Sequence, residues 1–138
     1  MNKTVLDLLY NDLCGRLPYD TIIEVHGIYE DREKCDRIMT LKTSNINDIF
    51  DPEKTVIVYL RPLLSMTEEE KQEFYNKFVV NGIDFSVFKK IFENHFTTLL
   101  TSFEHFWHAV EWLNSKHFDY RGLIEKGIAL PAKEKMYE

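Results

Sequence analysis

Residues that build specialised sites are scarce in this sequence. Its 138 residues include two cysteines, four prolines and five glycines. Cys14 and Cys35 form no CxxC pair and have no spacing typical of a zinc site or a disulfide framework, so we expect both thiols to be reduced. Loops that cradle phosphate need clustered glycines, and the sequence has no glycine-rich phosphate loop, Rossmann fingerprint or GxSxG motif. The sequence therefore predicts no cofactor and no catalytic residue.

Long apolar runs and basic clusters are also missing. The longest strongly apolar run, residues 56–60, is far shorter than the roughly 20 residues that a membrane-spanning helix needs. The first ten residues lack the basic start and apolar run of a signal peptide. The net charge is −6, and no stretch concentrates lysine and arginine as a phosphate-binding surface requires. We therefore expect a cytoplasmic protein without membrane association, for which nucleic-acid binding is disfavoured.

The chain contains enough apolar residues for one core. Hydrophobic residues make up 44% of it, and a domain of this length buries roughly two-thirds of its unfolded surface. No internal repeat, low-complexity tract or domain-length linker is visible. We therefore expect one α+β domain over residues 1–138, with a helix and sheet in residues 1–62, helices in residues 63–130, and a frayed tail in residues 131–138.

The first half predicts an amino-terminal helix followed by a small antiparallel sheet of about three strands. Thr4 is suited to cap a helix whose apolar residues recur at helical spacing until Gly15. Residues 21–29 and 38–41 are rich in β-branched and aromatic side chains and predict a hairpin. The nearly unbroken apolar run at residues 55–60 is typical of a central strand covered on both faces.

The second half predicts helices. Thr67 and Glu70 have the spacing of a capping box, in which each side chain binds the backbone N–H of the other residue. Asp84 is suited to cap a second helix with phenylalanines along one face, and a third helix is expected over residues 101–116. A short helical turn is expected over residues 121–126, before a glycine stop.

The third helix places a tryptophan in an unexpected position. On a helical wheel, the expected core stripe contains Leu99, Phe103, Phe106, Trp107, Val110 and Leu113. Trp112, His105 and His108 fall opposite this stripe. A large aromatic side chain on the solvent face is usually covered by its own chain or by a partner. Either residues 118–123 fold back over Trp112, or Trp112 and the two histidines form a recognition patch.

A metal site on this helix is a weaker alternative. His105 and His108 are three residues apart, and Glu104 and Glu111 lie on an adjacent flank. A convincing site needs ligands from a second element, and this HxxH lacks the embedded glutamate of a zincin. The sequence therefore predicts no metal.

Residues 118–121 supply further candidates for a binding surface. Asp119, Tyr120 and Arg121 lie between two expected helical pieces. Arg121 can pair with Asp119 or offer its planar guanidinium group to an anionic ligand. We therefore add Phe118, Tyr120 and Arg121 to the candidate ligand- or partner-binding residues.

Two segments of the chain are distinctive: YLRPLLSMTEEEK at residues 59–71 and HFDYRGLIEKGIAL at residues 117–130. They resemble the hallmark segments of an uncharacterised family of small proteins from Bacteroides-type gut bacteria and their phages and prophages, and the opening residues 13–25 are also similar to that family. The family commonly has a second serine where this chain has Leu64. The resemblance implies a small cytoplasmic accessory protein and is compatible with a phage origin.

Three functions remain open at this point. The leading hypothesis is a non-enzymatic binding protein that recognises a protein or a small anionic ligand, with self-association as a homodimer as a special case. The second is a small enzyme with a site of histidine and carboxylate side chains. The third is a single-stranded nucleic-acid module that stacks bases on Tyr29 or Tyr59.

Overall fold

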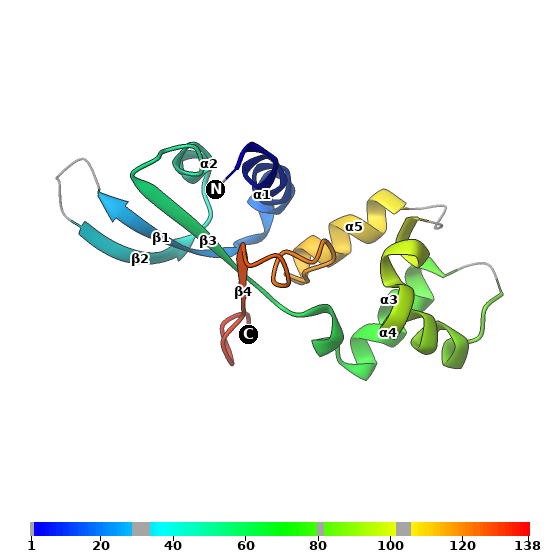
Figure 1. Ribbon diagram of the computed structural model, residues 1–138. Coiled ribbons are helices and arrows are strands. Elements are labelled where there is room, and N and C mark those ends of the chain that lie inside the picture. The colour runs from blue at the N-terminus through cyan, green and yellow to red at the C-terminus, as the bar shows by residue number, and fades with distance from the viewer. Residues whose placement is uncertain (1, 29–33, 80–81, 102–105) are drawn as a thin grey trace.

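A four-stranded mixed sheet lies beside a group of helices (Figure 1). The computed structural model describes residues 2–28, 34–79, 82–101 and 106–138. The helices are α1 (Lys3–Arg16), α2 (Thr43–Asp48), α3 (Glu68–Phe78), α4 (Phe85–Thr101) and α5 (Phe106–Ser115). The strands are β1 (Ile22–Ile28), β2 (Lys34–Thr40), β3 (Lys54–Leu60) and β4 (Ala129–Pro131). The predicted α+β class is confirmed.

The sheet has the strand order β2-β1-β3-β4. The predicted hairpin and central strand are confirmed, because β1 pairs antiparallel with both β2 and β3. The structure adds one strand to the three expected: β4 pairs parallel with β3, with Val58 opposite Ala129. Its sequence, Ala-Leu-Pro, is too short for an alternating pattern and ends in a residue that strands tolerate at edges. The sheet is therefore mixed.

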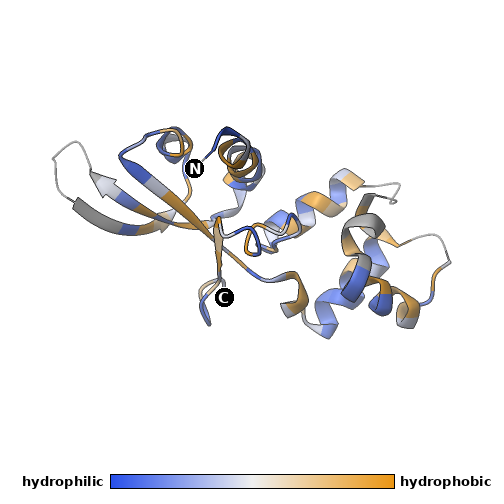
Figure 2. Cartoon of the chain, viewed as in Figure 1, coloured by the Kyte–Doolittle hydropathy of each residue, from blue (hydrophilic) through white to orange (hydrophobic). Residues whose placement is uncertain are grey.

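Helices α1 and α2 cover one face of the sheet (Figure 1). Strand β3 is hydrophobic along most of its length (Figure 2), and its side chains Val56, Val58 and Leu60 are buried. They pack in one cluster with apolar residues of α1, including Leu9 and Leu13. Burial of this cluster holds α1 against the sheet.

Helix α1 begins earlier and ends later than the sequence indicated. The side chain of Asn2, rather than Thr4, caps it by accepting a hydrogen bond from the N–H of Val5 at 3.0 Å. The helix also continues past Gly15. A Cβ atom at Gly15 would lie 3.2 Å from Nδ2 of Asn114, so the glycine permits close approach of α1 and α5. This glycine serves helix packing and does not end the helix.

The predicted capping box at the start of α3 is confirmed. The hydroxyl of Thr67 accepts from the N–H of Glu70 at 3.1 Å, and the Glu70 carboxylate accepts from the N–H of Thr67 at 3.1 Å. Arg61 also donates to both Glu70 carboxylate oxygens, at 2.7 and 2.9 Å. Burial alone would raise the pKa of Glu70, but these hydrogen bonds lower it. The ion pair ties the end of the sheet to the start of the helices.

Helices α3, α4 and α5 enclose a second core that is rich in aromatic rings. The predicted phenylalanine face of α4 is confirmed for Phe88, Phe92 and Phe96, which are buried. Phe88 and Phe96 pack against Phe74 of α3, and Phe92 contacts both of them. Helix α4 continues through Thr101, where the sequence placed the start of the third helix. Residues 102–105 lie outside the described residues, and α5 begins at Phe106.

The end of the chain is packed against the sheet and is not frayed. The hydroxyl of Tyr137 accepts from the N–H of Ile22 at 2.8 Å and donates to the carbonyl of Tyr59 at 2.6 Å. The mostly charged residues 133–138 do not indicate this contact, because the backbone groups that Tyr137 binds, in β1 and β3, lie far away in the chain. Residues 121–126 also differ from expectation, forming hydrogen-bonded turns before Gly127 without a regular helix.

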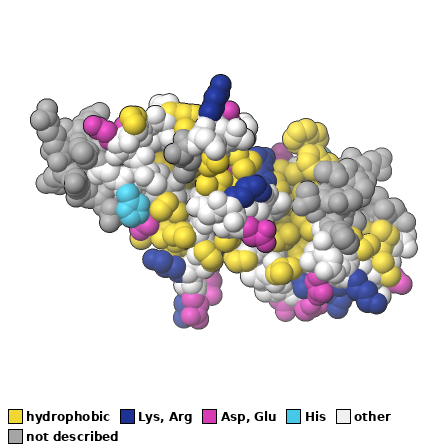
Figure 3. Space-filling view, viewed as in Figure 1, with side chains coloured by type: hydrophobic (Ala, Val, Ile, Leu, Met, Phe, Trp, Pro, Cys, Tyr) yellow, Lys and Arg dark blue, Asp and Glu magenta, His cyan; other side chains and the backbone are white. Residues whose placement is uncertain are grey.

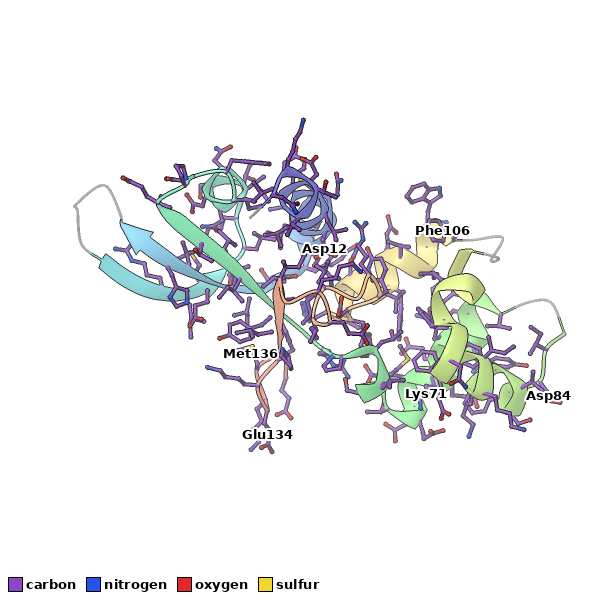
Figure 4. The ribbon with its side chains drawn as sticks, viewed as in Figure 1. Asp12, Lys71, Asp84, Phe106, Glu134 and Met136 are labelled. Carbon is purple, nitrogen blue, oxygen red and sulfur yellow. The ribbon has the colours of Figure 1, made fainter. Side chains whose placement is uncertain are left out.

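A buried ion pair links the two halves of the molecule. Asp12 and Arg16 of α1 are both fully buried, and Arg16 donates to the two Asp12 oxygens at 2.8 and 3.1 Å. Arg16 also donates to the carbonyl of Phe118, in the loop after α5, at 2.9 Å. In Figure 4, Asp12 lies near this loop. Because both charges are removed from water, each is stabilised by the opposite charge of the other.

Removing one member of this pair should destabilise the fold strongly. We expect Asp12→Asn to lower the free energy of unfolding by about 3–5 kcal/mol, because Arg16 would remain buried without its counter-charge. Urea denaturation provides the measurement, and Asp7→Asn on the exposed face of α1 is the control, expected within about 0.5 kcal/mol of the parent. The double variant Asp12→Leu/Arg16→Met should be more stable than Asp12→Asn. Equal stability of Asp12→Asn and the parent would contradict this interpretation.

Candidate binding groove

A cavity of about 550 Å³ lies between α5, the end of α4 and the loop that follows α5. Figure 3 shows hydrophobic side chains gathered on this face over α5 and that loop. We call the cavity the α5 groove. Its described lining consists of Leu100, Phe106, Trp107, Val110, Tyr120, Arg121 and Lys126. Small-molecule sites typically have volumes of roughly 300–1,000 Å³ and combine apolar walls with a few polar groups, as this groove does.

The two tryptophans have exchanged the positions that the sequence indicated. Trp107, placed in the core stripe, is 76% exposed and lines the α5 groove, whereas Trp112, placed on the solvent face, is 8% exposed. The physical reason is tertiary packing. Phe74 of α3 and Phe118 of the loop after α5 lie against the Trp112 side of α5, and a helical wheel of one helix does not show where other elements pack. The buried residues of α5 are Ala109, Trp112, Leu113 and Asn114.

Trp112 is covered by the protein itself. Its ring stacks on Phe118 with 6.1 Å between centroids, and it meets Phe74 edge-on at 5.5 Å. Its indole N–H donates to a carboxylate oxygen of Glu73 at 3.4 Å. The alternative in which the following segment folds back over Trp112 is therefore confirmed for Phe118. The exposed patch expected around Trp112 is wrong.

Among the described residues, the predicted histidine His108 is absent from the lining of the α5 groove. His108 is exposed and lies 3.9 Å from Glu111 in the same helix, whereas His105 and Glu104 lie outside the described residues. Among the residues that the structure describes, no group of three histidine, cysteine or acidic side chains is arranged to hold a metal ion.

Two of the predicted binding residues, Tyr120 and Arg121, do lie together in the α5 groove. The expected pairing of Arg121 with Asp119 is wrong, because Asp119 accepts hydrogen bonds from the backbone N–H groups of Leu123 and Ile124. Nε of Arg121 instead lies 3.7 Å from the buried Asp12. The Arg121 guanidinium therefore lies between an internal carboxylate and the groove.

Tyr120 connects the groove to the buried ion pair. The guanidinium carbons of Arg16 and Arg121 each lie 5.4 Å from the centre of its ring, within the range of a cation–π contact. Its hydroxyl is buried and has no hydrogen-bond partner among the described residues, and Nη1 of Arg16 shares this property. Buried polar atoms are normally paired, so this part of the groove wall has unused hydrogen-bonding capacity.

Sequence reasoning missed Trp107, Lys126 and Leu100 as groove residues. The sequence indicates only that Lys126 ends a helical turn, whereas in the structure Lys126 and Arg121 belong to one loop and line the same cavity. The sequence signal for Lys126 is its closeness to Arg121, because two basic residues among apolar residues are unusual in a chain with a net charge of −6.

The surface expected for stacked nucleic-acid bases is not offered by Tyr59. Its side chain is 3% exposed, and its hydroxyl donates to Glu24 at 3.4 Å. Tyr29, the second candidate, lies outside the described residues. The prediction for Tyr59 is therefore wrong.

No protein-family model matches this chain, and comparisons with curated proteins and with solved structures likewise found no match. Within the described residues, no helix combines the length and apolar character needed to cross a bilayer. Function is therefore inferred from the geometry of the groove.

His117 lies in the loop that follows α5, and it makes the packing of this loop against Tyr137 sensitive to pH. Its ring stacks on Tyr137 with 3.8 Å between centroids, and Nδ1 lies 3.4 Å from the hydroxyl of Thr21. Burial lowers the pKa of His117 to about 4, and the positive charges of Arg16 and Arg61 contribute to this shift.

Lowering the pH should therefore weaken the fold through His117. As the pH falls from 6.5 to about 4, His117 becomes protonated in the unfolded chain but stays neutral in the folded chain. The stability that His117 contributes is therefore fully present above this range and is lost as the pH falls through it. Because the ring is partly exposed, we expect a loss on the order of 1–2 kcal/mol. Urea midpoints across this range should fall less for His117→Gln than for the parent. The same fall in both would show that His117 is not responsible, and the exposed His108→Gln variant serves as the control, expected to follow the parent.

Proposed function

We propose that this protein is a non-enzymatic binding protein, and that it holds a ligand with an apolar body and an anionic group in the α5 groove. The observation that carries the proposal is the 76% exposure of Trp107 beside a cavity with apolar walls and the cations Arg121 and Lys126 at its border. An exposed tryptophan next to an apolar cavity is typical of a recognition surface.

The charge of the groove determines the kind of ligand. The chain as a whole has a net charge of −6, yet Arg121 and Lys126 both line this cavity. An arginine can bind a carboxylate, sulfonate or phosphate through two parallel hydrogen bonds, and a nearby lysine adds a point charge. The apolar walls would bury the remainder of the ligand. This chemistry is compatible with a small amphipathic anion and with an acidic segment of a protein.

The proposal also includes a cytoplasmic location and an accessory role. Both follow from the resemblance of residues 59–71 and 117–130 to the small-protein family of gut bacteria and their phages. A second copy of this chain is one protein that could occupy the groove.

Anilinonaphthalene sulfonate, an aromatic body with one anionic group, tests the groove directly. The chain has two tryptophans, so the indole N–H region of a proton–nitrogen correlation spectrum has two signals, which Trp107→Phe assigns. We expect the probe to shift the Trp107 signal and leave the Trp112 signal in place, because Trp112 is buried and its N–H is bound by Glu73.

The charge requirement is tested by a matched pair of variants. Arg121→Gln/Lys126→Gln should weaken binding of the probe by about tenfold or more, since each charged hydrogen bond contributes about 1.5–3 kcal/mol. Lys3→Gln/Lys90→Gln removes the same charge from exposed positions outside the groove lining and should bind as the parent does. A probe that shifts Trp112, or that binds both double variants equally, would contradict the proposal.

A further inference from the structure

The two edges of the sheet differ in how they are protected. At one edge, β4 is three residues long and ends in Pro131, which has no backbone N–H to donate. At the other edge, β2 is seven residues long, contains no proline and pairs with β1 without a bulge (Figure 1). Among the described strands, β2 has a neighbour on its β1 side only. Such an edge is a template for a further strand.

The register shows which backbone groups point out of this edge. The N–H of Leu41 donates to the carbonyl of Thr21 at 2.7 Å, directly beyond the last residue pair of the β1–β2 ladder. Because hydrogen-bonded pairs alternate along an antiparallel ladder, the odd-numbered residues of β2 bind β1. The N–H and C=O groups of the even-numbered residues, among them Asp36, Ile38 and Thr40, therefore point away from the sheet.

An exposed apolar side chain lies at the same edge. Ile38 is 55% exposed and stands opposite Glu24 of β1. The neighbours of Glu24 in β1, Ile23 and Val25, are buried in one cluster with Leu9 of α1, so Ile38 lies on the opposite face of the sheet. The β2 edge thus combines outward-pointing backbone groups with an apolar side chain that a further strand would cover.

A second copy of β2 fits this edge in one register. Residues that stand opposite each other share a face, so a two-fold axis between two identical antiparallel strands passes through a pair of identical residues. Centring on Asp36 or on Arg37 would place identical charges opposite each other, which is destabilising. Centring on Ile38 places the two isoleucines together, with Asp36 opposite Thr40 and Arg37 opposite Met39. Centring nearer either end of β2 pairs fewer residues.

We infer that two copies of this chain associate through β2, by antiparallel pairing centred on Ile38, so that one sheet continues across both copies. Ile38 exchanges backbone hydrogen bonds with Ile38 of the second copy, and Asp36 exchanges them with Thr40 of the second copy. This surface lies on the sheet, and no residue of β2 lines the α5 groove. The inference therefore does not depend on the proposed function.

Analytical ultracentrifugation of the full chain over a range of concentrations tests this association. The parent should change from monomer to dimer as the concentration is raised, whereas Ile38→Pro should sediment as a monomer. Proline at this position removes an N–H that points out of the sheet, so the hydrogen bonds between β1 and β2 are kept while a second strand is blocked.

Two substitutions of Thr40 test the register. Thr40→Lys places a lysine opposite Asp36 on both sides of the two-fold axis and should tighten the dimer about threefold or more, whereas Thr40→Glu should weaken it by a similar factor. Thr55→Lys and Thr55→Glu are the matched controls, because they make the same charge changes at an exposed position of β3. At physiological salt these controls should stay within about twofold of the parent.

Each result decides the inference. Loss of the dimer in Ile38→Pro, together with tightening by Thr40→Lys, would confirm it, and the Thr40 variants remain decisive if Ile38→Pro does not fold. A parent that stays monomeric at every concentration would overturn it and assign the edge to a strand of a different protein. A dimer that only Trp107→Ala abolishes would place self-association in the α5 groove instead. A dimer that Thr40→Lys weakens or leaves unchanged would contradict the register, since centring on Arg37 places Thr40 opposite Lys34.

Discussion

The buried pair of Asp12 and Arg16 is the interaction on which the arrangement of the molecule depends. It lies on α1, which packs against the sheet, and Arg16 donates to the carbonyl of Phe118 in the loop after α5. One fully buried guanidinium therefore fixes the helical half relative to the sheet half. The hydrogen bond from Arg16 to the Phe118 carbonyl also positions the residues that follow Phe118. Two of these residues, Tyr120 and Arg121, line the α5 groove. The buried Asp12–Arg16 pair therefore contributes both to the stability of the fold and to the position of the groove residues.

The parts of the fold that depend on neighbouring residues could be predicted from the sequence. The capping box of Thr67 and Glu70, the central strand β3 and the phenylalanine face of α4 are all encoded within a few turns or residues of chain. Strand β4 and the packing of Tyr137 could not be predicted in this way. Each is stabilised by residues about seventy or more positions away, and neither has a local pattern strong enough to indicate its partner.

The candidate site was predicted in part, for a related reason. Tyr120 and Arg121 were identified because an aromatic ring and a guanidinium group side by side are typical of recognition surfaces, whatever the fold around them. Trp107 was missed because the buried side of α5 is determined by Phe74 of α3 and Phe118 of the following loop, which cover Trp112, and the helical pattern alone does not indicate these contacts. Lys126 was missed because only the turns after Asp119 bring it to the cavity that Arg121 lines.

Hydrogen–deuterium exchange with and without anilinonaphthalene sulfonate tests the central claim, binding in the α5 groove, most directly, because it reports on every part of the chain at once. The account predicts slower exchange in α5 and in residues 118–126, with β1 and β2 unchanged, since these strands lie in the sheet half, away from the groove (Figure 1). Slower exchange confined to the sheet, with α5 unaffected, would contradict it.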